Sequence, residues 1–313
     1  MSAVGDVIAA FAAHAGSAGV FCDFDGTLAP VVDDPSAALP LAGAADTLEA
    51  LARRYARVGV ISGRPGAFLA EHLGGRGLAL TGLYGLEVVT PAGVRPVQAA
   101  KAWRSVVEEV AGRAEAELPP ALGVERKDLS VAVHFRVSPG YADLAQRWTA
   151  DAAARSGLAV HAARMSFELR PPLPHDKGLV LAQSAAGLTH VLFVGDDRGD
   201  LEAYDALDAL AAGEGVTVAR VAVRSPEVPA ELLERADVVV DGPEGVLSLL
   251  RGLADAPPPP GAPPPDDPPP GAPPLNAPPP DDAPPDDAPP DDAPPDDAPL
   301  SAPRAADAPP ALP

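Results

Sequence analysis

Two carboxylates separated by one residue are the first sign of chemistry in this chain of 313 residues. Asp23 and Asp25 directly follow the apolar run at residues 19–22, and Gly26 and Thr27 come next, so a tight turn and a hydroxyl lie beside the acids. One carboxylate of such a pair can attack phosphorus and form an aspartyl-phosphate. The other can protonate a leaving oxygen and then activate water. Asp23 and Asp25 are therefore candidate catalytic residues.

More polar groups follow other apolar runs of the chain. They are Ser62, Gly63 and Arg64 after the run at residues 58–61, Lys177 before a helical pattern, and Asp196, Asp197 and Asp200 after the run at residues 191–194. Ligands of open α/β sheets bind at the carboxyl ends of the strands. We therefore expect these side chains to meet in one pocket with the two candidate catalytic acids.

So many carboxylates in one pocket would repel one another without a cation. Hard oxygen ligands suit Mg²⁺, which is the cofactor that the sequence predicts. The metal would neutralise and position a phosphate, while the hydroxyls and Lys177 would stabilise charge on the transferring group. Each motif alone is common in turns, so the interpretation depends on their joint order.

Apolar runs alternate with helical patterns through most of the chain and define the elements that must position this pocket. The runs lie at residues 19–22, 58–61, 78–80, 191–194, 216–223 and 238–240. Continuous apolar strands between helices are typical of a parallel sheet covered on both faces. Right-handed crossovers then give an α/β class fold with a doubly wound, Rossmann-like core.

The middle of the chain follows a different pattern. Helical patterns at residues 99–117 and 141–154 alternate with strand pairs at 123–127 and 130–136, and at 158–162 and 166–169. The order α-β-β-α-β-β predicts a small α+β domain inserted into the main sheet. We expect a catalytic core at residues 1–97 and 172–254 and an inserted cap at residues 98–171.

The last 59 residues, 255–313, have a composition of their own. They hold 26 of the 41 prolines and repeat Pro-Pro-Asp-Asp-Ala four times. Too few large apolar residues are present to offset the entropy of folding, so the sequence predicts a disordered, extended tail. Such a tail can be a spacer or a ligand for a protein partner. It carries about half of the net charge of −21, and a chain this acidic is not expected to bind nucleic acid.

Cysteine count and hydropathy limit the class of protein further. A single cysteine, Cys22, excludes an internal disulfide framework and is compatible with a reducing compartment. The N-terminus lacks the basic segment of a signal peptide. No apolar run approaches the roughly 20 residues that span a bilayer. We expect a soluble, cytoplasmic protein with no membrane partner.

The order and spacing of the motifs resemble those of the haloacid dehalogenase superfamily of phosphatases. The four motifs begin at Asp23, Ser62, Lys177 and Gly195, and an inserted cap also matches. The resemblance implies that Asp23 is the nucleophile and Asp25 the acid/base. It implies phosphate binding by Thr27, Ser62 and Lys177, with Gly63 and Arg64 in the same site, and Mg²⁺ held by Asp23, the Asp25 carbonyl and Asp196, with Asp197 and Asp200 in support.

The cap narrows the resemblance to trehalose-6-phosphate phosphatases. Residues 124–127, 134–136 and 164–171 look like segments of that family's cap, and residues 82–87 resemble one of its loops. Tyr84 stands where His is common, and Arg164 where Lys is common; Gly199 and Leu201 also depart from the family pattern. The implied substrate-binding residues are Glu125, Lys127, His134, Arg136, Arg164 and Glu168.

The sequence thus predicts a Mg²⁺-dependent phosphatase that converts trehalose 6-phosphate to trehalose and phosphate. The nearest alternative is the same chemistry on another phosphosugar, such as sucrose phosphate or glucosylglycerate phosphate. A non-catalytic binding protein that works through the tail is a third possibility, against which the intact acids and Lys177 argue. A nucleotide dehydrogenase is excluded, because no Gly-x-Gly-x-x-Gly follows the first strand.

Overall fold

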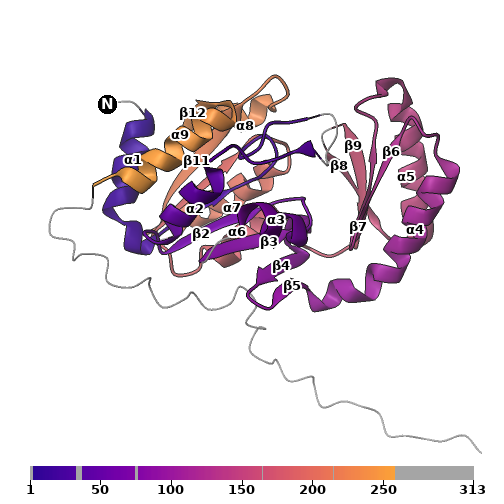
Figure 1. The fold of residues 1–313 in the computed structure, drawn as a ribbon, viewed down its shortest axis with the longest axis horizontal. Helices are drawn as coiled ribbons and strands as arrows, with labels where there is room; N and C mark the ends of the chain where they lie inside the picture. The colour runs from indigo at the N-terminus through magenta and orange to yellow at the C-terminus, as the bar shows by residue number, and fades with distance from the viewer. Residues whose placement is uncertain (1–2, 33–36, 75–76, 164, 214, 258–313) are drawn as a thin grey trace, which may run out of the picture. The chain divides into compact units, whose positions relative to one another are not determined.

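A large sheet forms the core of the molecule (Figure 1). The computed structural model describes residues 3–32, 37–74, 77–163, 165–213 and 215–257. Within these residues the main sheet has eight strands in the order β12-β11-β10-β1-β2-β3-β4-β5. Pairing is parallel from β12 to β3 and antiparallel for the hairpin of β4 and β5. The strands are β1 (Ala18–Cys22), β2 (Arg57–Ile61), β3 (Leu78–Gly82), β4 (Glu87–Thr90), β5 (Gly93–Pro96), β10 (His190–Gly195), β11 (Thr217–Arg224) and β12 (Val238–Asp241).

Helices cover both faces of this sheet, which confirms the predicted doubly wound α/β class. On one face lie α1 (Ala3–Ala13), α2 (Ala44–Ala52), α3 (Gly66–Leu73) and α9 (Gly242–Asp255). On the other lie α6 (Lys177–Ser184), α7 (Asp200–Ala212) and α8 (Ala230–Arg235). All five residues of β1 are buried, and so are all six of β10. These two central strands therefore read as continuous apolar runs in the sequence.

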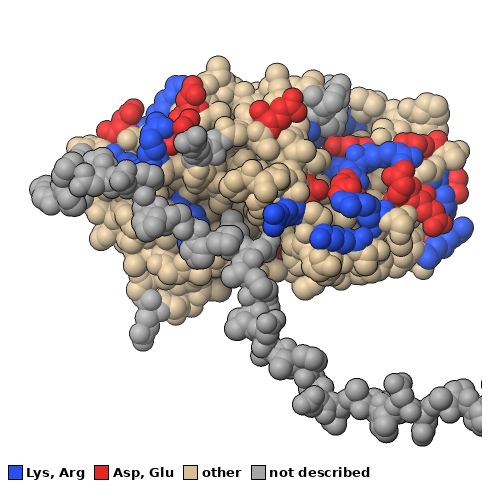
Figure 2. All heavy atoms as spheres, turned by 60° about the horizontal axis from the view of Figure 1, so that its bottom comes forward, with Lys and Arg blue, Asp and Glu red and all other residues tan. Residues whose placement is uncertain are grey.

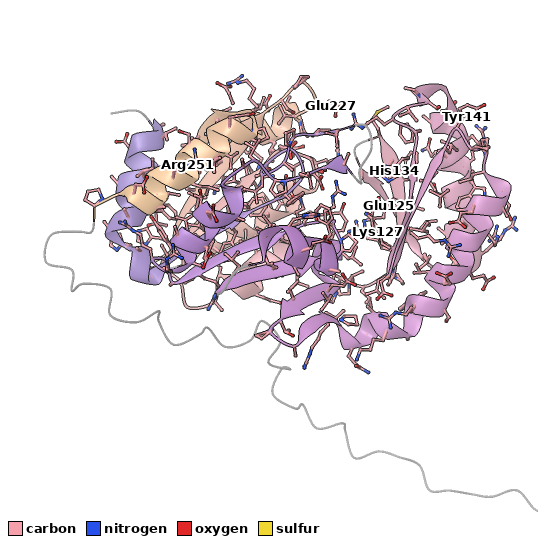
Figure 3. All side chains as sticks on the ribbon, viewed as in Figure 1. Glu125, Lys127, His134, Tyr141, Glu227 and Arg251 are labelled. Atoms are coloured by element: carbon pink, nitrogen blue, oxygen red, sulfur yellow. The ribbon has the colours of Figure 1, made fainter. Side chains whose placement is uncertain are left out.

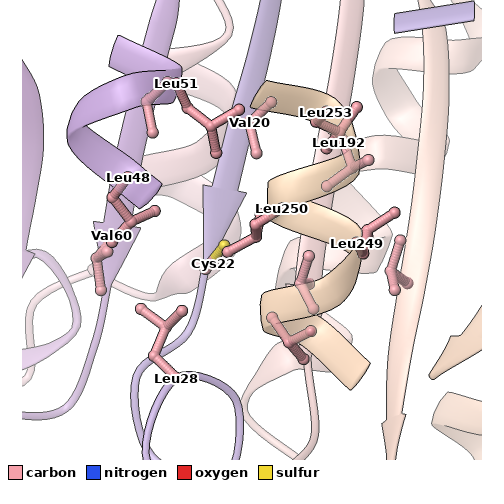
Figure 4. Close-up of a cluster of buried hydrophobic side chains, with 14 of the residues drawn as sticks. Val20, Cys22, Leu28, Leu48, Leu51, Val60, Leu192, Leu249, Leu250 and Leu253 are labelled. Carbon is pink, nitrogen blue, oxygen red and sulfur yellow. The ribbon is translucent and has the colours of Figure 1, made fainter. Parts of the chain in front are cut away.

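Aliphatic side chains fill the layer between α2, α9 and the sheet (Figure 4). Leu48 and Leu51 of α2 and Leu250 of α9 belong to the same buried cluster as Val20 and Cys22 of β1. Burial of such side chains stabilises a fold by roughly 1.5–3 kcal/mol each. This packing holds β1 in place, and both candidate catalytic acids follow its last residue.

The inserted cap is a second, four-stranded antiparallel sheet in the order β6-β7-β9-β8. Its strands are β6 (Gly123–Lys127), β7 (Ser130–His134), β8 (Ala159–Ala163) and β9 (Ser166–Arg170), and its helices are α4 (Arg104–Glu117) and α5 (Ala142–Ser156). Val131 and Leu169 pack against the helices. Because neighbouring residues of a strand point to opposite faces, Ala132, Glu168 and Arg170 lie on the other face. Core and cap belong to one compact unit.

Charged side chains of both signs cover the helices of the cap. Arg126 pairs with Glu108 and Glu115, and Arg113 pairs with Glu117. On the face shown in Figure 2 such side chains lie intermixed over the cap. Exposed pairs of this kind contribute little to stability, about 0–1 kcal/mol each.

The elements differ from the sequence prediction in two places. The expected helix at residues 99–117 starts as a 3₁₀ segment (η4, Gln98–Trp103), in which Ala100 is buried with Leu83 and Leu129 at the entrance to the cap. The hairpin of β4 and β5 was not predicted, because each strand has only four residues, and β5 forms the edge of the sheet. Further 3₁₀ turns within the described residues include η1 (Ala15–Ser17), η3 (Leu83–Gly85) and η5 (Pro139–Tyr141).

The C-terminal helix α9 ends at Asp255, the residue at which the predicted tail begins. The rest of the predicted disordered tail, residues 258–313, lies outside the described residues. In the described part of the chain, every helix is too short or too polar to span a membrane.

Candidate active site

The loop after β1 places Asp23 and Asp25 at the carboxyl edge of the sheet. The Asp23 N–H donates to the carbonyl of Val194 at 2.9 Å, which ties this loop to the end of β10. Gly26 adopts φ +77°, and a Cβ built on it would overlap the carboxylate of Asp196. Glycine thus permits both the left-handed backbone and the close approach of the Asp196 carboxylate to this loop.

Lys177 lies at the centre of three carboxylates. Its Nζ is 3.0 Å from Asp23 Oδ1, 2.7 Å from Asp200 Oδ1 and 3.8 Å from Asp197 Oδ1, and its side chain is buried. Burial favours neutral lysine, but the charges of Asp200 and Asp23 outweigh it and raise the pKa of Lys177 well above its usual value. Burial also raises the pKa of Asp23, although the Lys177 charge opposes this shift. A permanent buried cation therefore stands beside the candidate nucleophile.

Asp200, the first residue of α7, holds the loop of the fourth motif in place. Its Oδ2 accepts hydrogen bonds from the N–H groups of Asp196 at 2.8 Å and Asp197 at 2.9 Å, while its Oδ1 accepts from Lys177. A Cβ built on Gly195 would overlap this carboxylate. Both Asp200 oxygens are thus engaged in holding the loop and the lysine.

Arg64 contacts Asp25 directly. Its Nε and Nη2 donate to the two Asp25 oxygens at 2.8 and 2.6 Å, and its guanidinium lies over the ring of Phe68 at 4.8 Å. Burial lowers the pKa of Arg64, but the hydrogen bond and charge of Asp25 give a net rise. Ser62 Oγ accepts from the Arg64 N–H at 3.1 Å. Arg64, predicted as a phosphate ligand, therefore also fixes the orientation of the candidate acid/base.

Three further observations bear on a divalent cation and a phosphate at this edge. Oxygens of Asp23, Asp197 and Asp200 lie within 4.8 Å of one another around the Lys177 ammonium, and hard oxygens of this kind also suit Mg²⁺. Because Gly26 has no Cβ, the Asp196 carboxylate lies close to the same loop. Thr27 Oγ1 is buried and has no hydrogen-bond partner among the described residues, so it can donate to a ligand.

Charged side chains of the cap form a network on the sheet face opposite the cap helices. Lys127 Nζ lies 3.1 Å from Glu168 Oε1 and 3.8 Å from Glu125 Oε2. Ser130 Oγ donates to Glu168 Oε1 at 2.6 Å, and His134 Nε2 is 2.9 Å from Glu125 Oε2. Figure 3 shows Glu125, Lys127 and His134 on the side of the cap sheet that faces the core.

The surroundings of both glutamates in this network favour the ionised form. Burial raises the pKa of Glu125, but the hydrogen bond from His134 and the charge of Lys127 lower it to about 2. Burial likewise opposes ionisation of Glu168, and the charges of Lys127 and Arg170 bring its pKa below the usual value. The cap therefore presents fixed acceptors and donors to the core.

The cap meets the core through polar contacts. Lys127 Nζ donates to the carbonyl of Gly63 at 3.3 Å. Arg136 donates to both oxygens of Glu227 at 2.9 and 3.2 Å, and Glu227 follows β11 in the core. These contacts bring the predicted substrate residues close to the loop that carries Ser62.

A cavity of about 140 Å³ lies between core and cap. Most of the predicted site residues line it. The lining includes Asp23, Asp25, Ser62, Gly63, Arg64, Lys177 and Asp197 from the core and Glu125, Lys127, His134, Arg136 and Glu168 from the cap. Thr27, Asp196 and Asp200 are fully buried and do not line it. Arg164 lies outside the described residues.

Sequence reasoning gave no role to several residues of this region. Tyr84 lines the cavity with φ +57°, next to Leu83 at φ +48°, and left-handed backbone costs roughly 1–2 kcal/mol per non-glycine residue. Tyr84 departs from the family pattern of its loop, and Arg170 lies in the segment 164–171 that resembles the family's cap, but the sequence assigned neither residue a role. Glu227 carried no sequence signal, since its contact with Arg136 spans 91 positions.

Comparisons with known proteins support one family. The family model described as trehalose-phosphatase matches residues 21–236. The trehalose-phosphate phosphatase of Mycobacterium avium (strain 104) is 35% identical over 250 residues, which cover 72% of this chain and 63% of that protein. The chain thus spans less than two thirds of the length of this curated relative.

Solved structures share the fold. The C-terminal domain of Candida albicans trehalose-6-phosphate phosphatase is 22% identical with a TM-score of 0.66, covering 80% of this chain and 96% of that one. Aspergillus fumigatus trehalose-6-phosphate phosphatase is 25% identical with a TM-score of 0.56, covering 82% of this chain and 98% of that one.

Proposed function

Because the chain belongs to the trehalose-phosphatase family of the haloacid dehalogenase superfamily, we propose that it hydrolyses trehalose 6-phosphate to trehalose and phosphate. The observation that carries the proposal is the position of Asp23. Its carboxylate lies 3.0 Å from the buried Lys177 ammonium, on a cavity whose opposite wall is the polar face of the cap. A candidate nucleophile, a buried cation and several hydrogen-bond donors and acceptors of the cap therefore line one cavity.

In the proposed reaction an Asp23 oxygen attacks phosphorus, and the bond from phosphorus to the sugar oxygen breaks. Asp25 gives its proton to the leaving oxygen, so the sugar departs as an alcohol. Asp25 then takes a proton from water, whose oxygen attacks the aspartyl-phosphate and releases inorganic phosphate and free Asp23. Arg64 keeps Asp25 in one orientation through both proton transfers.

Mg²⁺ bound at this edge would neutralise the phosphate and position it for attack. Asp23, the Asp25 carbonyl and Asp196 are the residues that we propose to hold it, with Asp197 beside them. Asp200 would support the site through the hydrogen bonds that it accepts from the backbone of Asp196 and Asp197 and from Lys177.

The phosphate oxygens would be held by hydroxyls and cations of the core. Thr27 has a free buried hydroxyl, Ser62 and Gly63 line the cavity, and Lys177 supplies a charge that does not depend on pH near neutrality. Such preorganised donors stabilise charge that develops in the transition state.

The cap would recognise the sugar and exclude water. Glu125, Lys127, His134 and Glu168 offer acceptors and donors to ring hydroxyls, and Arg136 lies at the rim beside them. Arg164 is part of this proposal on sequence grounds alone. Closure of the cap over the ring would shield the reacting groups from bulk water.

Three further features belong to the proposal. The chain passes between core and cap after β5 and after β9, so we place the boundaries at residues 97/98 and 171/172. We propose a cytoplasmic location on the basis of the sequence. The role of residues 255–313 as a ligand for a protein partner is also a proposal from sequence.

Phosphate release from trehalose 6-phosphate, measured for the full chain with Mg²⁺, tests the function. Asp23→Asn should lower the rate at least 10³-fold while the far-UV CD spectrum stays unchanged. Asp205→Asn, at an exposed position of α7, is the matched control and should keep the full rate. Chelation with EDTA should stop turnover and added Mg²⁺ should restore it. Full turnover by Asp23→Asn contradicts the nucleophile, and turnover in EDTA contradicts the metal.

A further inference from the structure

A second, larger cavity of about 620 Å³ adjoins the first. The two share Tyr84, Ala163, Glu168 and Asp197 in their walls. Small-molecule sites usually measure about 300–1,000 Å³, so the 140 Å³ cavity alone is too small for a phosphorylated disaccharide, whereas the larger one is in the usual range. The reaction derived above uses no residue that belongs to the larger cavity alone.

Arg170, the last residue of β9, lies in the wall of this second cavity. Its guanidinium lies over the Tyr84 ring, 4.0 Å from the ring centre. The residue is only 8% exposed, and its Nε is buried with no hydrogen-bond partner among the described residues. The Tyr84 ring can attract the cation through its face, but it offers no acceptor to N–H groups that point along the guanidinium plane.

A carboxylate on the same strand as Arg170 is already engaged. Glu168 lies two residues before Arg170 on the same face of β9, and its Oε1 accepts from Lys127 and Ser130. A buried N–H without an acceptor is costly, because its lost hydration is not replaced. The Arg170 Nε donor therefore points to a ligand that brings an acceptor atom into the cavity.

Other side chains of the cavity indicate a neutral, hydroxyl-rich ligand. His161 of β8 pairs in register with Glu168 and so shares the face that bears Arg170. Arg198 adds a donor, whereas Glu202 and Glu227 add acceptors. A ligand with several negative charges would face these carboxylates, but sugar hydroxyls can both accept from arginine and donate to glutamate.

We propose that the second cavity is a sugar subsite of the same active site, and that Arg170 donates hydrogen bonds to the ring that does not carry the phosphate. This inference rests on the proposed function, because it assumes that the first cavity takes the phosphorylated end. Arg170 would then select disaccharide over monosaccharide phosphates.

The test compares Arg170→Met with wild type on two substrates, trehalose 6-phosphate and p-nitrophenyl phosphate, which lacks a sugar. The ratio of their kcat/KM values should fall at least 10-fold in Arg170→Met, mainly through KM for the sugar phosphate. Arg170→Lys keeps the charge but not the planar donor set, and it should show a smaller fall in the same direction. Arg155→Met, which removes an exposed arginine from α5, is the control and should leave the ratio unchanged.

Inhibition of p-nitrophenyl phosphate hydrolysis gives a second measurement that needs no turnover of a sugar phosphate. Wild type should be inhibited more tightly by trehalose than by glucose, and Arg170→Met should remove most of that difference. Equal losses on both substrates, or an unchanged ratio, would show that Arg170 only supports Tyr84 and would overturn the subsite. Weakened inhibition by sulfate with no change for trehalose would assign the cavity to an anion instead.

The outcomes separate the two proposals. If wild type does not hydrolyse trehalose 6-phosphate, the proposed function fails, and the inhibition by trehalose and glucose still decides the subsite. If wild type hydrolyses it and Arg170→Met keeps the full preference, the function stands and the subsite fails.

Discussion

Replacing Asp200 with asparagine should damage the site without touching the candidate nucleophile. Asp200 accepts from two backbone N–H groups, those of Asp196 and Asp197, and from the Lys177 ammonium. Asparagine has one acceptor oxygen. If that oxygen takes the backbone N–H groups, the new NH₂ faces the Lys177 donor, and if it faces Lys177, the NH₂ faces the backbone donors.

The magnitude follows from these contacts. One charge-assisted hydrogen bond is lost, worth about 1.5–3 kcal/mol, and breaking a buried ion pair by neutralising one partner typically costs 3–5 kcal/mol. Asp23 stays close to Lys177 and limits the loss. We expect Asp200→Asn to lower the free energy of unfolding by about 3 kcal/mol and to slow turnover at least 100-fold, because Lys177 and the loop of Asp196 and Asp197 shift together.

Urea unfolding followed by far-UV CD is the suitable assay, since Trp103 and Trp148 both lie in the cap and their fluorescence would follow that part alone. Gly195→Ala should have a similar effect, because its Cβ would displace the Asp200 carboxylate. Asp205→Asn, at an exposed position of the same helix, should change the free energy of unfolding by less than about 0.5 kcal/mol. The reasoning is refuted if Asp200→Asn resembles this control.

Three other substitutions have defined outcomes. Burial, and then the charge of Arg170, lower the pKa of His161 to about 4. As the pH falls below about 6.5, the unfolded chain therefore binds a proton before the folded chain does, and the free energy of unfolding should drop by roughly 1–2 kcal/mol between pH 7 and 5, allowing for partial exposure. In urea titrations, His161→Gln should reduce this drop. Gly26→Ala should raise the Mg²⁺ concentration for half-maximal rate at least 10-fold, because its Cβ would overlap the Asp196 carboxylate. An unchanged value would contradict a role for the close approach of Asp196 to Gly26 in Mg²⁺ binding. Cys22→Ser should lower the free energy of unfolding by about 1–3 kcal/mol, because a hydroxyl replaces a thiol in the apolar layer, but it should keep the full kcat. A large fall in kcat would show that the thiol takes part in the reaction.

Strand ends were the most predictable part of the molecule. The central strands are buried on both faces, so their apolar runs stand out, and the polar residue after each run marks the edge where ligands bind. This logic predicted that Asp23, Ser62 and Asp196 lie near one another; Asp23 and Ser62 line one cavity, and the Asp196 carboxylate lies against Gly26 of the same loop as Asp23.

Contacts between distant side chains were not predictable in the same way. The pairing of Arg64 with Asp25 depends on the angle between two loops, and the pairing of Arg136 with Glu227 depends on how the cap meets the core. The backbone conformation of Tyr84 has no signature, because a non-glycine residue with positive φ is set by its surroundings. Burial of Arg170 Nε depends on the fold, which places the guanidinium over the Tyr84 ring.

The most direct test of the central claim is the rate of phosphate release from a panel of sugar phosphates by the full chain with Mg²⁺. The panel holds trehalose 6-phosphate, sucrose phosphate, glucosylglycerate phosphate and glucose 6-phosphate. We expect kcat/KM for trehalose 6-phosphate to exceed each of the others by at least 10-fold. A higher value for another member of the panel, or no phosphate release from trehalose 6-phosphate, would contradict the account.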